Sequence, residues 1–205
     1  MVSWFEIIFD FVGMVFEGGS SKEPMKIRWK KKDKRSVMPI AKIVDLPDDA
    51  RAWVFGSDKT LDAATSDALL NEVDLFLAQW KAHGVPLTVG RDWRFGRFLM
   101  VAVDQTTAGA SGCSIDGLFQ TLMGLERRLG ANLVTSCLIF FRDENGAIQS
   151  VTRKEFASRA ADGKISSETQ VFDPTITTLG EWRARFELTV ADSWHAKLLE
   201  KRQPA

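Results

Sequence analysis

The chain has 205 residues, 45% of them apolar and 26% charged, which is the composition of a globular protein with a buried core and excludes disorder along the whole chain. Lysine plus arginine and aspartate plus glutamate both number 27, so no net field attracts nucleic acid, and no nucleic-acid partner is expected. Two cysteines are too few for a disulfide framework. These features favour a soluble, cytoplasmic protein.

The first 37 residues differ in character from the rest of the chain. Residues 2–16 are strongly apolar, but they include Glu6 and Asp10 and would span only about 22 Å as a helix, less than the ~30 Å hydrocarbon core of a bilayer. No basic n-region precedes this segment and no small-residue cleavage site follows it, so a signal peptide is not indicated. A basic run comes next. Residues 1–35 can therefore contact an anionic membrane surface, or else the start codon is assigned too early and the protein begins at Met38.

A strand followed by a long helix opens the main part of the chain. The strand is predicted at 51–56, where β-forming residues follow a turn-rich stretch. Thr60 or Asp62 can cap the start of the helix, and Gly84 and Pro86 end it. Its apolar residues recur at three- and four-residue spacing, which is the helical period: Leu69, Leu70, Val73, Phe76, Leu77 and Trp80.

A hairpin, a second long helix and another strand come next. Residues 86–95 alternate in polarity and 98–103 are apolar on both faces, which predicts two paired strands joined by a turn at Gly96. The helical period then resumes and ends at Gly130. Its apolar residues are Ile115, Leu118, Phe119, Leu122, Leu125 and Leu129. The apolar run at 134–141 predicts the next strand.

The resulting β-α-β-β-α-β order predicts a ferredoxin-like sheet. Its last strand belongs at a sheet edge, yet 134–141 is apolar on both faces, and Cys137 within it is expected to act as a small hydrophobe. A turn at 143–146 followed by a fifth strand at 147–151 covers that edge. Residues 38–205 are therefore expected to form a single α+β domain.

The C-terminal part is predicted to be a small helical appendage packed on this sheet. Thr152 with Glu155, and Thr178 with Glu181, have the spacing of capping boxes, in which each threonine starts a helix. Gly163 ends the first of these helices. A last helix is expected to carry Trp194, His195 and Leu198.

One constellation has residue types suited to chemistry, at 110–116 before the second long helix. Free N–H groups at a helix start can bind an anion or lower the pKa of a thiol. We expect Cys113 at or just before the N-cap, Ser114 as the cap and Asp116 in the first turn. The candidate ligand-binding residues are Ser111, Gly112, Ser114, Asp116 and Asp104. The simpler interpretation is structural: Gly112 permits a tight turn, the serines satisfy N–H groups and the thiol fills a small pocket.

Both histidines are candidate catalytic partners of Cys113. His83 is expected at the C-terminal end of the first long helix, where a structural cap is its ordinary role, and His195 lies near the last helix. If either imidazole lies beside the thiol, the pair can perform nucleophilic chemistry, with a carboxylate to orient it. The candidate carboxylates are Asp104, Asp116 and Asp192. A zinc site is the alternative, built from Cys113, Asp116, His83 and His195, although no short ligand spacing supports it.

Nucleotide-binding motifs are missing. Gly163-Lys164 is followed by Ile165, and Ser158 stands where a phosphate loop needs its first glycine, so there is no Walker A motif. A G-x-G-x-x-G run is absent as well. The aromatic residues of the predicted sheet are not accompanied by a basic stripe, so we interpret them as core.

Several segments carry a resemblance: Arg51-Ala-Trp53, Trp80-Lys-Ala-His-Gly84, Val103-Asp104, Ala110-Ser-Gly-Cys-Ser-Ile-Asp116 and Asp192-Ser-Trp-His195. Together they resemble a family of small uncharacterised bacterial proteins often labelled "ABC transporter ATPase", over about residues 43–199. Members usually begin near the equivalent of Met38 and often have Glu in place of Gln105. The transporter label does not fit, because the phosphate loop and an L-S-G-G-Q helix are both missing. The resemblance implies a shared fold and no established activity.

Three hypotheses follow. A non-catalytic binding or interaction module is favoured because no catalytic motif is complete. The alternative is a Cys/His-dependent small-molecule enzyme or a metal-binding protein with its site at the Ser111–Asp116 turn. A membrane-surface protein is the third, through residues 1–35. The residues identify no cofactor, substrate or partner.

Overall fold

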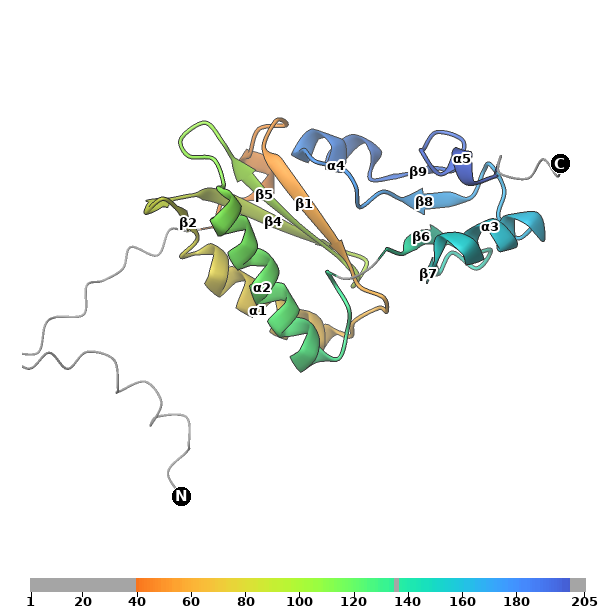
Figure 1. Cartoon of the computed structure of the whole chain (residues 1–205), viewed down its shortest axis with the longest axis horizontal. Coiled ribbons are helices and arrows are strands. Elements are labelled where there is room, and N and C mark those ends of the chain that lie inside the picture. Colours follow the sequence, from red (N-terminus) through yellow and green to blue (C-terminus); the bar gives the residue numbers. More distant parts are fainter. Residues whose placement is uncertain (1–39, 135–136, 200–205) are drawn as a thin grey trace, which may run out of the picture. The chain divides into compact units, whose positions relative to one another are not determined.

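The structure is a computed structural model that describes residues 40–134 and 137–199, all within one compact unit. The predicted apolar segment, the basic run and the alternative start at Met38 lie outside the described residues. Helices and strands are mixed along the chain, which confirms the predicted α+β class (Figure 1). In the described part, no helix is long and apolar enough to cross a membrane.

A three-stranded antiparallel sheet with strand order β1-β5-β4 forms the centre of the first half. Its elements, with a short 3-10 helix before them, are η1 Ile43–Asp45, β1 Arg51–Gly56, α1 Ala63–Leu77, β2 Lys81–Ala82, β3 Val85–Pro86, β4 Thr88–Arg94, β5 Phe98–Asp104 and α2 Gly112–Leu129. The predicted hairpin is confirmed: Arg94 pairs with Phe98, and the turn residues Phe95 and Gly96 both have positive φ, 59° and 62°. The central strand β5 is buried from Phe98 to Val103, as its two apolar faces predict.

Helix α1 ends earlier than its apolar period predicts. Asp62 caps its start by accepting a hydrogen bond from the Thr65 N–H at 2.7 Å, but the helix stops at Leu77. The Trp80 carbonyl already accepts from the Leu87 N–H (3.0 Å), so this backbone pairs in the small β2–β3 hairpin instead of continuing the helix. His83 therefore does not cap α1. It occupies the hairpin turn with φ 49°, a correction to the predicted role.

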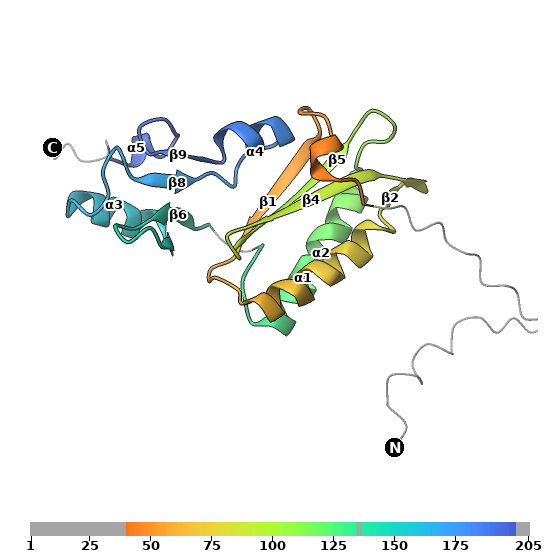
Figure 2. The same ribbon diagram turned by 180° about the vertical axis from the view of Figure 1, so that it is seen from behind.

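Helices α1 and α2 cover one face of the β1-β5-β4 sheet, as Figures 1 and 2 show from opposite sides. Gly130 ends α2 in the left-handed conformation, as predicted. The side chains of β5 alternate between two cores because successive residues of a strand point to opposite faces. Leu99, Val101 and Val103 pack against α1 and α2.

The second half forms a separate antiparallel sheet with strand order β7-β6-β8-β9. Its elements are β6 Ile139–Arg142, β7 Ile148–Val151, α3 Arg153–Ala161, β8 Gln170–Phe172, α4 Leu179–Arg185, β9 Glu187–Thr189 and α5 Ala196–Leu199. The predicted hairpin of β6 and β7 is present, and both capping boxes are confirmed by reciprocal hydrogen bonds. The predicted helical appendage is therefore only part of this region, because two strands, β8 and β9, belong to it as well.

The predicted ferredoxin-like sheet is not confirmed, because β6 pairs with β7 and β8 and not with β1. In a ferredoxin-like fold the fourth strand lies along the outer edge of β1. Here that edge is taken by another segment: the Ala52 N–H donates to the Thr177 carbonyl (2.8 Å), and Arg51 bridges to Thr178. The predicted burial of Cys137 is also wrong. Its side chain is exposed, because β6 begins only at Ile139.

The other face of the β1-β5-β4 sheet is covered by residues from the second sheet and from α4. Phe98, Met100 and Ala102 of β5 pack there in a core with a ring of aromatic side chains: Phe140, Phe172, Trp182 and Phe186. The approach is close at Gly56, where an added Cβ would lie 2.6 Å from the Phe140 ring. Only glycine fits at that position.

Arg97 links the two sheets from inside the protein, where it is 4% exposed. Its guanidinium donates to the carbonyls of Ser57 (2.9 Å), Asp58 (2.7 Å) and Ile148, and to the Ser150 hydroxyl (2.9 Å). Burial lowers the pKa of Arg97 from its ordinary value. Because the first two acceptors follow β1 and the last two belong to β7, the side chain holds both sheets together.

Candidate functional site

The turn before α2 is built by its serines. Ser111 is the N-cap, and its Oγ accepts from the Ser114 N–H at 3.3 Å while the Ser114 hydroxyl donates to the Ser111 carbonyl at 2.8 Å. The helix thus begins one turn earlier than predicted, and the assignment of Ser114 as the cap was wrong. Gly112 is not required for a tight turn, because its φ is not positive and an added Cβ would meet no atom within 4 Å.

Cys113 lies in the first turn of α2 with an exposed side chain, so it does not fill a small pocket. Asp116 is exposed as well, but the first turn of α2 contains no acidic residue, so the predicted place of Asp116 in that turn was wrong. Asp104 accepts a hydrogen bond from the Thr106 N–H at 2.9 Å, which holds its carboxylate within its own loop. The turn therefore presents an accessible thiol without a side-chain hydrogen bond to it among the described residues.

His195 belongs to a different core from Cys113. It is 0% exposed and stacks on Trp194, with ring centroids 3.8 Å apart, beside Phe156. Its Nδ1 lies 3.0 Å from the Ser193 hydroxyl, and its Nε2 is buried without a hydrogen-bond partner in the described part of the chain. Burial lowers the pKa of His195 to about 4, so the ring is neutral at pH 7. The structure does not bring this imidazole to the thiol.

His83 is exposed in the turn of the β2–β3 hairpin, and β2 packs against α2. Within residues 40–134 and 137–199, no hydrogen bond joins His83 to Cys113. Among the same residues, no group of three His, Cys, Asp or Glu side chains lies close enough to hold a metal ion. The four residues weighed for a zinc site are thus not gathered in one place.

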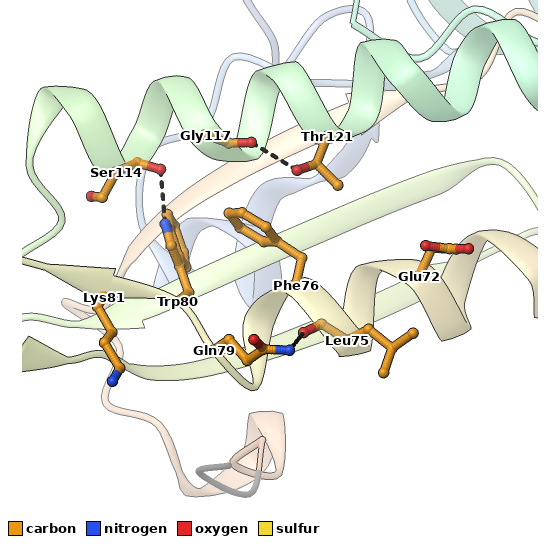
Figure 3. A pocket seen from close by; sticks show the side chains of 9 residues that line it. All are labelled: Glu72, Leu75, Phe76, Gln79, Trp80, Lys81, Ser114, Gly117 and Thr121. Atoms are coloured by element: carbon orange, nitrogen blue, oxygen red, sulfur yellow. Dashed lines mark hydrogen bonds between the residues drawn. The ribbon is translucent and has the colours of Figure 1, made fainter. Parts of the chain in front are cut away.

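An open groove lies between α1 and α2 close to this turn (Figure 3). We call it the α1–α2 groove. It has a volume of about 590 Å³ and is lined by Glu72, Leu75, Phe76, Gln79, Trp80, Lys81, Ser114, Gly117 and Thr121. In Figure 3 the rings of Phe76, on α1, and of Trp80, in the segment after it, point toward α2, and Lys81 and Glu72 stand at opposite ends.

The base of the α1–α2 groove is held rigidly by Trp80. Its indole N–H donates to the Ser114 carbonyl at 2.8 Å, a bond that joins the segment after α1 to the first turn of α2. Phe76 packs on the same indole with ring centroids 5.6 Å apart. The groove is open between these contacts because Gly117 has no side chain facing Phe76.

The groove was not predicted from the sequence, although two features of α1 bear on it. Phe76 and Trp80 were assigned to the helical core face, but only Trp80 is buried and Phe76 is half-buried. Leu75 does not fit the three- and four-residue spacing of the buried residues of α1, and its side chain is 62% exposed. An apolar residue off the core face of an amphipathic helix is only a weak sign of a contact surface, because single exposed apolar residues are common on proteins.

No protein-family model, no curated protein and no solved structure matches the chain. A function must therefore be argued from the geometry of the turn and the groove.

Proposed function

We propose that this protein is a non-catalytic interaction module whose contact surface is the α1–α2 groove. The observation that carries the proposal is the open hollow of about 590 Å³ in which Leu75 is 62% exposed and the Phe76 ring is half-buried. Apolar side chains that remain uncovered inside a polar rim are typical of a surface that binds another molecule. Such a module needs shape and apolar area, and it needs no acid, base or nucleophile.

The distribution of the histidines supports this interpretation. His195 is sealed in another core, and its neutral ring has no route to a groove substrate. Two polar groups of the groove are engaged in the fold itself: the Trp80 indole N–H donates to the Ser114 carbonyl, and the Thr121 hydroxyl donates to the Gly117 carbonyl at 2.8 Å. These bonds shape the surface.

A dye that fluoresces on apolar surfaces tests the accessibility of the groove. We expect dilute protein to bind anilinonaphthalene sulfonate, and Leu75→Ser to reduce that binding several-fold. Val44→Ser is the matched control, because Val44 is 74% exposed on η1 and does not line the groove. Equal dye binding by the wild type and Leu75→Ser would contradict the proposal.

A Cys/His-dependent enzyme is the second candidate, because the Cys113 thiol is exposed and the hairpin that carries His83 packs against the same helix. A panel of ester, thioester and phosphate-ester substrates tests it. Turnover that disappears in both Cys113→Ala and His83→Ala would favour the enzyme and overturn the non-catalytic proposal. Cys137→Ala is the matched control, since Cys137 is also an exposed thiol.

A further inference from the structure

We infer that the α1–α2 groove binds the same groove of a second copy of this chain, as the two-fold interface of a homodimer. The inference rests on the proposed function, because it requires the groove to be a contact surface, and it adds the identity of the partner.

The two ends of the groove carry opposite charges. The Lys81 ammonium stands at one end and has no carboxylate partner in the described part of the chain, and Glu72 stands at the opposite end (Figure 3). Glu72 has an exposed ion pair with Arg128, at 3.4 Å, and a pair between exposed side chains is weak enough to be exchanged for a cation of the partner copy. A half turn about an axis through the middle of the groove places each ammonium opposite the carboxylate of the other copy.

The apolar surface is also complementary to itself. Leu75 and Phe76 lie close to the middle of the stretch between Glu72 and Lys81, where a two-fold axis would pass. Leu75 is 62% exposed and Phe76 is half-buried, and the Phe76 ring already lies within contact distance (3.7 Å) of a Cβ added at Gly117. The leucine of one copy can therefore pack against the uncovered Leu75 and Phe76 side chains of the other copy. Contacts between identical subunits bury apolar side chains in this way.

A second copy fits this surface better than the helix of an unrelated protein. An unrelated helix would have to supply an acidic residue at one end of the groove and a basic residue at the other, with an apolar residue between them. The chain itself presents that set in reverse order, so a two-fold contact satisfies both charges without another component. Contacts of this symmetry are the commonest among soluble oligomers.

Sedimentation equilibrium of the full chain over a range of concentrations tests the inference. We expect a monomer–dimer equilibrium that Leu75→Ser weakens and Val44→Ser does not. Lys81→Glu and Glu72→Lys should each weaken association about tenfold, because each places like charges at two symmetry-related positions. The double variant Lys81→Glu with Glu72→Lys should restore association toward the wild-type value. Lys164→Glu, at an exposed site outside the groove, is the control for net charge.

A monomer at every concentration would overturn the second-copy inference, and so would a dimer that none of the groove variants weakens. Association that both single reversals weaken but the double variant fails to restore would also contradict the pairing of opposite charges between the two copies. The proposed function is tested separately by the dye. If the protein is a monomer but Leu75→Ser reduces dye binding, the interaction module stands and only the homodimer is ruled out. If Leu75→Ser does not reduce dye binding, the groove is not the contact surface.

Discussion

The two layers that cover the β1-β5-β4 sheet differ in how completely they bury their aromatic side chains. The layer that includes β6, β8 and α4 encloses its aromatic rings completely, and its Arg97 cross-link is sealed inside. The α1–α2 layer leaves Phe76 half-buried and Leu75 exposed. A sealed layer contributes stability, whereas an incompletely covered layer retains apolar area that can stabilise a complex. This contrast supports the proposed contact surface on α1 and α2.

The largest expected effect is in the sealed layer, at Arg97. Replacement of Arg97 by Met removes the guanidinium donor of the Ser57 and Ile148 carbonyls, while the Asp58 carbonyl keeps the Ser150 hydroxyl (3.0 Å), so we expect a loss of about 4 kcal/mol in the free energy of unfolding. Urea denaturation measures it. Arg97→Lys keeps the charge but not the fork of donors, and it should lose less than Arg97→Met. A change of less than about 1 kcal/mol in Arg97→Met would show that the two sheets do not depend on this link.

The second effect, also in a sealed core, is a pH dependence from His195. The unfolded chain binds a proton at the ordinary pKa of 6.5 and the folded chain only near 4, so between these values the unfolded state holds more protons. Lowering the pH through this window therefore destabilises the fold, by up to about 3 kcal/mol. The groups that modulate this pKa are Asp173, which raises it, and Arg153, which lowers it.

His195→Leu isolates this effect. Both proteins lose stability in acid as carboxylates titrate, so the informative quantity is the difference in unfolding free energy between wild type and variant at each pH. We expect the unfolding free energy of the wild type to fall relative to that of His195→Leu as the pH is lowered from 6.5 to about 4. A constant difference across that window would contradict the buried, neutral state of the ring.

A smaller effect is expected at the base of the open layer. Trp80→Phe removes the hydrogen bond to the Ser114 carbonyl and leaves unfilled volume, which should cost about 2 kcal/mol in unfolding free energy. Trp53→Phe is the matched control, since Trp53 is only half-buried and has no described indole hydrogen bond. Equal losses in the two variants would mean that the indole bond does not hold the groove.

The smallest effect is a gain in stability. Gly117→Ala should raise the unfolding free energy by about 0.5–1 kcal/mol, because alanine favours the helix and its Cβ would make an ordinary contact with Phe76 at 3.7 Å. Gly124→Ala, at an open position of the same helix, should give a similar gain. Only Gly117→Ala narrows the groove, so only that variant should reduce dye binding, as a dye titration can check.

Local features of the fold were predictable where the signal is local. The capping boxes at Thr152 and Thr178, the Gly130 helix end and the β4–β5 hairpin follow from neighbouring residues, and the structure confirms them. The end of α1 was mispredicted at Gly84, because the helical period of apolar residues continues to Trp80 whereas the backbone there pairs in the β2–β3 hairpin. A short-range pattern does not reveal which of two local structures the rest of the fold selects.

The sequence by itself determined the class of the fold, the two long helices and the strands β1, β4 and β5 of its first half, and which residues have apolar periodicity. Tertiary structure alone decided that β6 joins a second sheet, because that depends on whether another segment occupies the edge of β1, and residues Thr177 and Thr178 do so from far along the chain. It also decided that Cys113 and His195 lie in different surroundings. Distances between residues remote in sequence depend on how layers pack, and apolar periodicity carries no information about which layer each face will meet.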